Sequence, residues 1–446
     1  MTSGLAKNLN AWQLWGIAVG LVISGEYFGW SYGWAMAGTL GFLVTTAIVA
    51  VLYITFIFSF TELSTSIPHA GGPFAYSVRA FGSTGGYVAG YATLVEFVFA
   101  PPAIALAMGA YLNVQFPALA PKWAALAAYV FFMALNSIGV SIAATFELVV
   151  TILAIGELLL FMFIVAPGFQ LEHFLAHGWA GEDHPGASLV PGILQAVPFA
   201  IWFFLAIEGV AMAAEEVRDP HYAIPRAYVG GIGTLLVLAF GVMLFAGGVG
   251  DWRLIANIND PLPQAMKIVV GQSSAWLHVL VFIGLLGLVA SFHGIILGYS
   301  RQIFALAREG YLPAGLSYVH ARFKTPVWAI LAGGVIGMAA VSLDDVVSVS
   351  GQSLTALLVT MSALGALLMY AISMAGLLRL RASEPDLPRS FKAPFYPWFP
   401  LVALILSVLA LVAIAVGSPV VFGLFVAMGV VGFVLHTLTF KPLWRD

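Results

Sequence analysis

The chain has 446 residues, of which 61% are hydrophobic, 13% aromatic and only 8% charged, and its mean hydropathy is +1.00. Soluble proteins carry about 25% charged residues, so this composition cannot cover a soluble domain with polar surface. Seventeen Lys and Arg against twenty Asp and Glu give a formal charge of −3, which excludes the basic surface of a nucleic-acid-binding protein. The absence of cysteine excludes disulfides, thiol catalysis and thiolate metal sites. The composition is typical of a polytopic membrane protein.

Apolar runs long enough to cross a bilayer recur along the whole chain. The first run continues well beyond signal-peptide length without a small-residue cleavage site, so we expect it to be retained. The runs are too long for barrel strands, and helices satisfy their own backbone groups in lipid. We therefore expect an all-α protein with one integral membrane domain over residues 1–440. The twelve predicted spans are 12–39, 42–66, 84–113, 123–142, 147–167, 190–213, 227–249, 276–300, 327–343, 353–378, 399–417 and 419–438.

The positions of Lys and Arg predict the orientation of these spans. Cytoplasmic loops of membrane proteins are enriched in both residues. If the N-terminus is cytoplasmic, only Lys122, Arg253 and Lys267 of the seventeen cations are external, which leaves fourteen inside. We therefore expect an integral protein of the cell (inner) membrane with both termini in the cytoplasm.

Carboxylates lie within the predicted spans, whereas no Lys or Arg lies in the middle of one. An acidic residue at the centre of a spanning helix costs about 2.5–3.5 kcal/mol. Such a group is either neutralised by desolvation or meets a cation supplied from outside. For Glu62, a neutral acid that makes interhelical hydrogen bonds is the simpler interpretation, and for Glu157 this interpretation and a functional role both stay open. Glu26, Glu96, Glu157 and Glu208 lie in the middle of their spans, and Glu62 lies nearer the predicted cytoplasmic end of its span.

Two of these glutamates lie beside glycines that interrupt their spans. Glu26 follows Gly25 in SGEYFGWSYGW, and Glu208 precedes Gly209 in WFFLAIEGVAMAAEE. Glycines in mid-span allow the backbone to line a cavity. The two interruptions are five spans apart, as expected at the central site of a transporter with inverted repeats.

Aromatic residues crowd both interruptions. Aromatic faces stabilise desolvated organic cations by about 2 kcal/mol or more. Most aromatics of such a chain pack against helices or lipid, and we expect one or two of this set to contact a substrate. The set is Tyr27, Phe28, Trp30 and Trp34 at the first interruption, and Trp202, Phe203 and Phe204 at the second.

Three predicted cytoplasmic stretches carry a family resemblance. ELSTSIPHAGGPFAYSVRAFG follows the second span, AEEVRDPHYAIPRA the sixth, and SRQIFALAREGYLPAGLSYVHARFKTP the eighth. Their Pro, Gly and Arg spacing resembles the signatures of the amino acid–polyamine–organocation (APC) superfamily, over about residues 10–440. Within it, GEYFGWSYGW, EFVFAPPAIALAMGAYL, WFFLAIEGVAMAAEEVRDP and ASFHGIILGYSRQIFALAR are most similar to the ethanolamine permease group.

This resemblance implies a fold and a mode of action. The fold is the leucine-transporter-like 5+5 inverted repeat, in which helices one and six are broken at the binding site. The first repeat would span about 12–167 and the second about 190–381, followed by two extra helices over about 399–438. The implied function is secondary active transport, by alternating access, of protonated ethanolamine or a related amino alcohol.

The first interruption departs from the amino-acid carriers of this superfamily. They show a Gly-Ser-Gly-like break whose backbone N–H groups hold the substrate carboxylate. Here the stretch is Ser24, Gly25, Glu26, and the glutamate would repel such a carboxylate. The departure favours an amine without an acid group. Its ammonium would bind between Glu26 and Glu208, with Glu96 approaching from the third span. The other expected contacts are aromatic walls from Tyr27, Trp202 or Phe203, and hydroxyl partners at Ser24 or the backbone near Gly25 and Gly209.

The sequence does not determine the identity of the coupling ion. Some proton-coupled relatives carry a lysine near Glu157, but the local residues here are Gly156 and Glu157, so that mechanism does not transfer. Glu157 and His293 are the candidate proton carriers, since histidine titrates near neutral pH. A packing role is the alternative for His293.

A proton-coupled amino-acid permease is the alternative, and it requires Glu26 to be protonated or turned away. A membrane sensor would need a soluble signalling domain, and no catalytic constellation indicates an enzyme. We expect no cofactor or metal, and interpret His173, His177 and His184 as part of a solvated acidic loop. The oligomeric state is left open.

Overall fold

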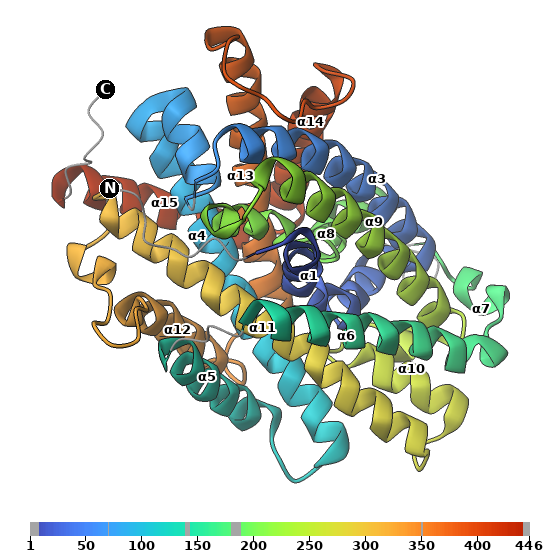
Figure 1. The fold of residues 1–446 in the computed structure, drawn as a ribbon. Helices are drawn as coiled ribbons and strands as arrows, with labels where there is room; N and C mark the ends of the chain where they lie inside the picture. Colours follow the sequence, from blue (N-terminus) through green and yellow to red (C-terminus); the bar gives the residue numbers. More distant parts are fainter. Residues whose placement is uncertain (1–8, 70, 139–142, 180–188, 349–350, 440–446) are drawn as a thin grey trace.

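The computed structural model describes residues 9–69, 71–138, 143–179, 189–348 and 351–439 as a bundle of helices (Figure 1). Within these ranges there is no β-strand, only an isolated bridge between Leu9 and Val217. The elements are α1 (Ala11–Val22), α2 (Ser24–Tyr27), α3 (Trp30–Ser66), α4 (Pro73–Gln115), α5 (Pro121–Ile138), α6 (Ala143–Val165), η1 (Ala166–Gly168), α7 (Leu171–Leu175), α8 (Leu189–Trp202), η2 (Ile207–Glu216), α9 (Pro220–Gly247), η3 (Trp252–Ile255), α10 (Pro261–Val270), α11 (Ala275–Arg308), η4 (Ala314–Ser317), α12 (Val327–Ser342), α13 (Leu354–Ser383), α14 (Trp398–Gly417) and α15 (Pro419–Thr439).

The length and polarity of these helices confirm the predicted fold class. Nine helices in the described ranges are long and apolar enough to cross a membrane, and the apolar helix Val327–Ser342 is slightly shorter. Each of the twelve predicted spans coincides with helical segments, although residues 139–142 at the end of the fourth lie outside the described part of the chain. The chain is an all-α polytopic membrane protein.

The first two predicted spans share the helix α3, which is kinked at Gly38. This glycine has φ +70°, and a Cβ there would overlap the backbone carbonyl of Gly178. Glycine has no side chain, so it adopts a left-handed backbone conformation at no steric cost. The kink therefore ends one span and begins the next, close to the predicted boundary between residues 39 and 42.

Both predicted interruptions are present. The helix α1 ends at Val22, α2 has only four residues, and α3 begins at Trp30 after Gly29, whose φ is +94°. On the second broken helix, α8 ends at Trp202 and η2 begins at Ile207. Between them Ala206 adopts a left-handed conformation with φ +78°. A non-glycine residue held in this region costs about 1–3 kcal/mol, so packing must hold the second break in place.

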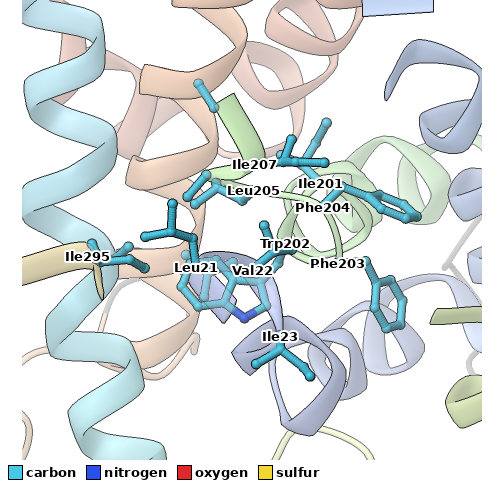
Figure 2. Packing of buried hydrophobic residues seen from close by; sticks show 14 of the residues in the cluster. Leu21, Val22, Ile23, Ile201, Trp202, Phe203, Phe204, Leu205, Ile207 and Ile295 are labelled. Atoms are coloured by element: carbon cyan, nitrogen blue, oxygen red, sulfur yellow. The ribbon is translucent and has the colours of Figure 1, made fainter. Parts of the chain in front are cut away.

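The two breaks pack directly against each other (Figure 2), with side chains of residues 21–23 beside those of residues 201–207. The rings of Phe28 and Trp202 meet edge to face at a centroid distance of 5.4 Å. Trp30 stacks on Phe203 at 6.5 Å. Gly25 faces the backbone of Trp202 so closely that a Cβ would overlap its carbonyl oxygen. The absence of a side chain at Gly25 therefore allows the close approach.

A pair of glycine substitutions tests this contact. We expect Gly25→Ala to lower the free energy of unfolding by about 1–3 kcal/mol, because an added methyl group in a packed interior forces the backbone to shift. Gly156 on α6 has no atom within 4 Å of a built Cβ, so Gly156→Ala is the matched control. It should be neutral or stabilise by up to about 1 kcal/mol. The measurement is thermal unfolding of both purified variants in detergent, and equal effects would contradict the contact.

Candidate functional site

Four of the predicted intramembrane carboxyl groups are buried at or near the breaks. Glu26, Glu96 and Glu208 expose no surface, and Glu157 exposes 2%. Both carboxyl oxygens of Glu26, Glu96 and Glu157, and Oε1 of Glu208, lack a hydrogen-bond partner among the described residues. Buried polar atoms are almost always paired in folded proteins. Seven unpaired carboxyl oxygens in one region therefore mark a place where a cation or protons are needed.

Glu96 is the carboxyl group that lies beside Glu208. Glu96 is on α4, and its side chain interacts with the carboxyl group of Glu208 and with the backbone of Ala206 at the second break. The Tyr370 hydroxyl on α13 donates a hydrogen bond of 3.1 Å to Oε2 of Glu208. It also lies 2.9 Å from the Tyr53 hydroxyl. Two carboxylates this close in a dry interior carry both charges only with a cation between them.

Glu26 occupies the first break separately. It lies on the four-residue helix α2, where its backbone carbonyl accepts a hydrogen bond of 3.0 Å from the Trp30 indole. Its carboxyl group has no hydrogen-bond partner among the described residues. The interacting carboxyl pair is therefore Glu96 with Glu208, which agrees with the expected approach of Glu96 from the third span, and Glu26 is a further uncompensated acid at the first break.

Hydroxyl groups from neighbouring helices bind backbone carbonyls that the breaks leave free. Tyr111 donates to the carbonyl of Tyr27 at 3.0 Å, and Tyr228 to that of Glu208 at 3.1 Å. Tyr53 donates to the carbonyl of Ile201 at 3.3 Å. These tyrosines were not predicted as site residues, because nothing in their local sequence indicates which carbonyl they reach. These hydrogen bonds satisfy backbone carbonyls at both breaks.

Ser24 retains the ability to accept a hydrogen bond. The Ser291 hydroxyl on α11 donates to the carbonyl of Leu21 at 2.6 Å. Its single proton is thereby used, so the 2.8 Å contact between Ser24 and Ser291 has Ser24 as donor. The lone pairs of Ser24 then stay available to a donor such as a substrate hydroxyl.

The remaining aromatic and glycine candidates have different neighbours. Trp202 and Phe203 pack against the first break, and the Trp202 indole N–H has no partner among the described residues. Tyr27 turns towards α6 and α11, where its hydroxyl donates to the carbonyl of Ala154 at 3.2 Å. A Cβ at Gly209 would contact Leu21 and Phe97, so Gly209 lies where η2 approaches α1 and α4.

The two candidate proton carriers lie in different surroundings. Glu157 interacts with Tyr27, so its carboxyl group belongs to the region of the first break. His293 instead faces α5, where its ring lies 6.1 Å from that of Phe132. Its Nδ1 has no hydrogen-bond partner among the described residues. Of the two, Glu157 is the one in contact with a break.

Glu147 is a buried acid that sequence reasoning missed. It lies near the start of α6, where it exposes 5% of its surface, and its Oε1 has no partner among the described residues. A Cβ at Gly20 of α1 would overlap this oxygen, and Gly294 of α11 also faces it. Glu147 is the first residue of the predicted span 147–167, whereas α6 begins earlier, at Ala143, so the carboxyl group lies inside the helix.

Glu62 differs from the other buried acids and corrects the expectation that no cation reaches them. Its carboxyl group lies 2.6 Å from Nε of Arg381 and 3.0 Å from Nε of Arg389. It also accepts a hydrogen bond of 2.7 Å from the backbone N–H of Ala393. Glu62 is therefore an ion-paired structural residue that ties α3 to α13. Its arginines were not recognised because they lie more than 300 residues away in the sequence.

No group of three or more His, Cys, Asp or Glu side chains that could hold a metal occurs within the described ranges. His173 hydrogen-bonds to the carbonyl of Gly248 at 3.1 Å. His184, the third histidine of the loop considered above, lies outside the described residues.

Comparison with known proteins identifies transporters over nearly the whole chain. Residues 9–436 match the amino acid permease family. An uncharacterized transporter of Rhizobium meliloti is 28% identical, over 93% of this chain and 88% of its own length. The branched-chain amino acid permease BcaP of Bacillus subtilis is 24% identical, over 98% and 95%. The low-affinity putrescine importer PlaP of Escherichia coli is 26% identical, over 68% and 67%.

The buried pairs of Glu62 and the partly exposed Arg79–Glu384 pair allow a matched test of the structural role of Glu62. We expect Glu62→Gln to lower the free energy of unfolding by about 3–5 kcal/mol, because it leaves two arginines without their counter-charge. Glu384, whose pKa the guanidinium of Arg79 lowers below its usual value, forms a partly exposed pair at 2.6 Å. Glu384→Gln should cost about 1 kcal/mol or less. Thermal unfolding of both variants checks this, and an equal loss would contradict a structural role for Glu62.

Proposed function

The chain belongs to the amino acid permease family, and from this premise we propose that it is a secondary active transporter that imports a small protonated amine without a carboxylate group. Ethanolamine or a related amino alcohol is the proposed substrate. The family and its transporter relatives indicate a permease and not an enzyme.

The observation that carries the proposal is the excess of uncompensated acid at the two breaks. Glu26, Glu96 and Glu208 are fully buried, and five of their six carboxyl oxygens have no partner among the described residues. A substrate carboxylate brought beside these groups would be repelled by several kcal/mol at low effective dielectric. An ammonium group supplies the missing positive charge instead.

In the proposed complex, the ammonium group binds at Glu96 and Glu208. Glu26 adds negative charge at the first break, and the faces of Trp202 or Phe203 add cation–π attraction. Ser24 accepts a hydrogen bond from the substrate hydroxyl. The putrescine importer PlaP is consistent with this chemistry, since putrescine carries amino groups and no carboxylate.

Transport requires the helices to move, because the site residues are closed off from solvent. Glu26, Glu96, Glu208 and Phe203 expose no surface in this structure. Substrate therefore enters or leaves only when the packing of the breaks opens, which is alternating access. An inside-negative membrane potential attracts a cation by about 2.3 kcal/mol per 100 mV. Proton coupling through Glu157 or His293 is thus compatible with import but not required for it.

An amino-acid permease is the second candidate. The relative BcaP, named as a branched-chain amino acid permease, matches 98% of the chain and favours this candidate. It requires the acids at the breaks to be protonated, so that a substrate carboxylate can approach. The two candidates therefore differ in whether Glu26, Glu96 and Glu208 are ionised or protonated when substrate binds.

Competition of uptake distinguishes the two candidates. In proteoliposomes with an inside-negative potential, we expect saturable uptake of labelled ethanolamine. Unlabelled ethanolamine should inhibit it fully, its N-methylated forms less, and alanine or leucine by less than twofold. The reason is that only an amine without a carboxylate avoids repulsion by the break acids. Strong inhibition by alanine or leucine, or absence of ethanolamine uptake, would contradict the proposed substrate and favour the amino-acid permease.

Glutamine substitutions test the assignment of the acids. Glu208→Gln, Glu96→Gln and Glu26→Gln each remove one negative charge at nearly constant shape, so we expect each to reduce ethanolamine uptake at least tenfold. Glu172 on α7 is exposed, and Glu172→Gln is the control that should transport normally. Expression and thermal unfolding of each variant separate loss of binding from loss of folding. Full activity in the break variants would refute the site.

A further inference from the structure

A cationic cavity lies outside the transport site, between the end of α13 and the start of α14. It has a volume of about 300 Å³ and is lined by Arg381, Pro385, Leu387, Arg389 and Lys392. The nearest buried acid is Glu62, which pairs with both arginines. Glu384 also interacts with Arg389 but is paired with Arg79, and Asp386 is exposed on the same segment. The four cations Arg79, Arg381, Arg389 and Lys392 therefore stand against the three acids Glu62, Glu384 and Asp386, which leaves an excess of positive charge.

The hydrogen-bond donors of the cavity show where an anion can bind. Arg389 is saturated, because its Nη atoms donate to the backbone carbonyls of Pro385, Leu387, Leu380 and Glu384. Arg381 uses Nε and Nη2 on Glu62, which leaves its Nη1 group. Lys392 is exposed and forms no ion pair or hydrogen bond within the described part of the chain. Arg381 and Lys392 therefore provide the donors for a ligand.

The surroundings of the cavity indicate the membrane surface. The side chains of Phe395 and Trp398 are 74% and 69% exposed, just before and at the start of the apolar helix α14. The guanidinium of Arg381 lies 4.3 Å from the centre of the Tyr396 ring. Exposed aromatics beside a basic segment are typical of the level of lipid headgroups. The distribution of Lys and Arg predicts this side to be cytoplasmic.

We propose that this cavity binds the phosphate group of an anionic phospholipid from the inner leaflet. The Nη1 group of Arg381 and the ammonium of Lys392 bind the phosphate oxygens, and Arg389 adds positive charge without a direct bond. Basic pockets on the cytoplasmic side of membrane proteins bind such headgroups. The exposed aromatics that follow the cavity in the chain favour a lipid over free phosphate, because exposed aromatic side chains at the end of an apolar helix are typical of the headgroup level. The bound headgroup would sit against the Glu62 ion pairs that join α3 to α13.

The experiment uses the full-length protein in detergent and follows thermal unfolding during lipid titration. Phosphatidylglycerol should raise the unfolding midpoint more than phosphatidylcholine does. Lys392→Gln should weaken the apparent affinity for phosphatidylglycerol about fivefold, the contribution of one basic residue at an anionic surface. Lys324→Gln removes another exposed cation on the same predicted side but outside the cavity, and should change the affinity by less than twofold.

Several outcomes would overturn the proposal. Equal stabilisation by both lipids would show that the cavity does not select an anionic headgroup, and equal affinity of the Lys392→Gln variant and the wild type would show that the lipid does not bind at Lys392. Stabilisation by millimolar inorganic phosphate alone, abolished by Lys392→Gln, would overturn the lipid as the source of the phosphate. These results are independent of ethanolamine uptake, since none of them measures transport.

Discussion

A carboxylate held away from water needs a positive charge beside it or a proton on it, because an isolated buried charge costs more than a fold can supply. The described residues meet this constraint in two different ways. Glu62 has two arginines and a backbone N–H within the protein. The Glu26 carboxyl group has none of these, Glu96 meets only the backbone of Ala206 and the carboxyl group of Glu208, and Glu208 has in addition the Tyr370 hydroxyl, so none of the three has a cation among the described residues. The first arrangement fastens helices together, and the second creates a requirement that an exchangeable cation can satisfy.

The broken helices depend on neighbours to satisfy their backbone groups. In lipid, each unpaired carbonyl is costly, so an interrupted helix persists only where other side chains bind it. The hydroxyl groups of Tyr53, Tyr111 and Tyr228 donate hydrogen bonds to the backbone carbonyls of Ile201, Tyr27 and Glu208, respectively. Since these tyrosines come from α3, α4 and α9, three further helices must stay in register with the breaks. The conformation of the breaks therefore depends on how these helices pack.

The sequence predicted the helices and the places where they break, but not the partners inside the bundle. Run length and glycine position are local properties, and they located the interruptions beside Glu26 and Glu208. The pairing of Glu96 with Glu208 depends on how α4 is rotated against η2, which a single sequence does not encode visibly. The interpretation of Glu62 as an acid without a cationic partner was wrong for a related reason, because Arg381 and Arg389 become its neighbours only after folding. Glu147 was missed because the predicted fifth span began at residue 147, whereas α6 begins at Ala143.

The unpaired oxygens at the second break also bear on the type of amine that fits. Both oxygens of Glu96 and Oε1 of Glu208 lack a well-aligned hydrogen bond among the described residues, so three acceptors are open to a cation that separates the two carboxyl groups. A primary ammonium group has three N–H donors in a compact head, as the lysine ammonium does. Each N-methyl group removes a donor and leaves one acceptor buried and unpaired, which costs about 1–3 kcal/mol. A quaternary head keeps its charge but has no donor at all. Charge alone would therefore admit any organic cation, whereas the count of acceptors favours a primary amine.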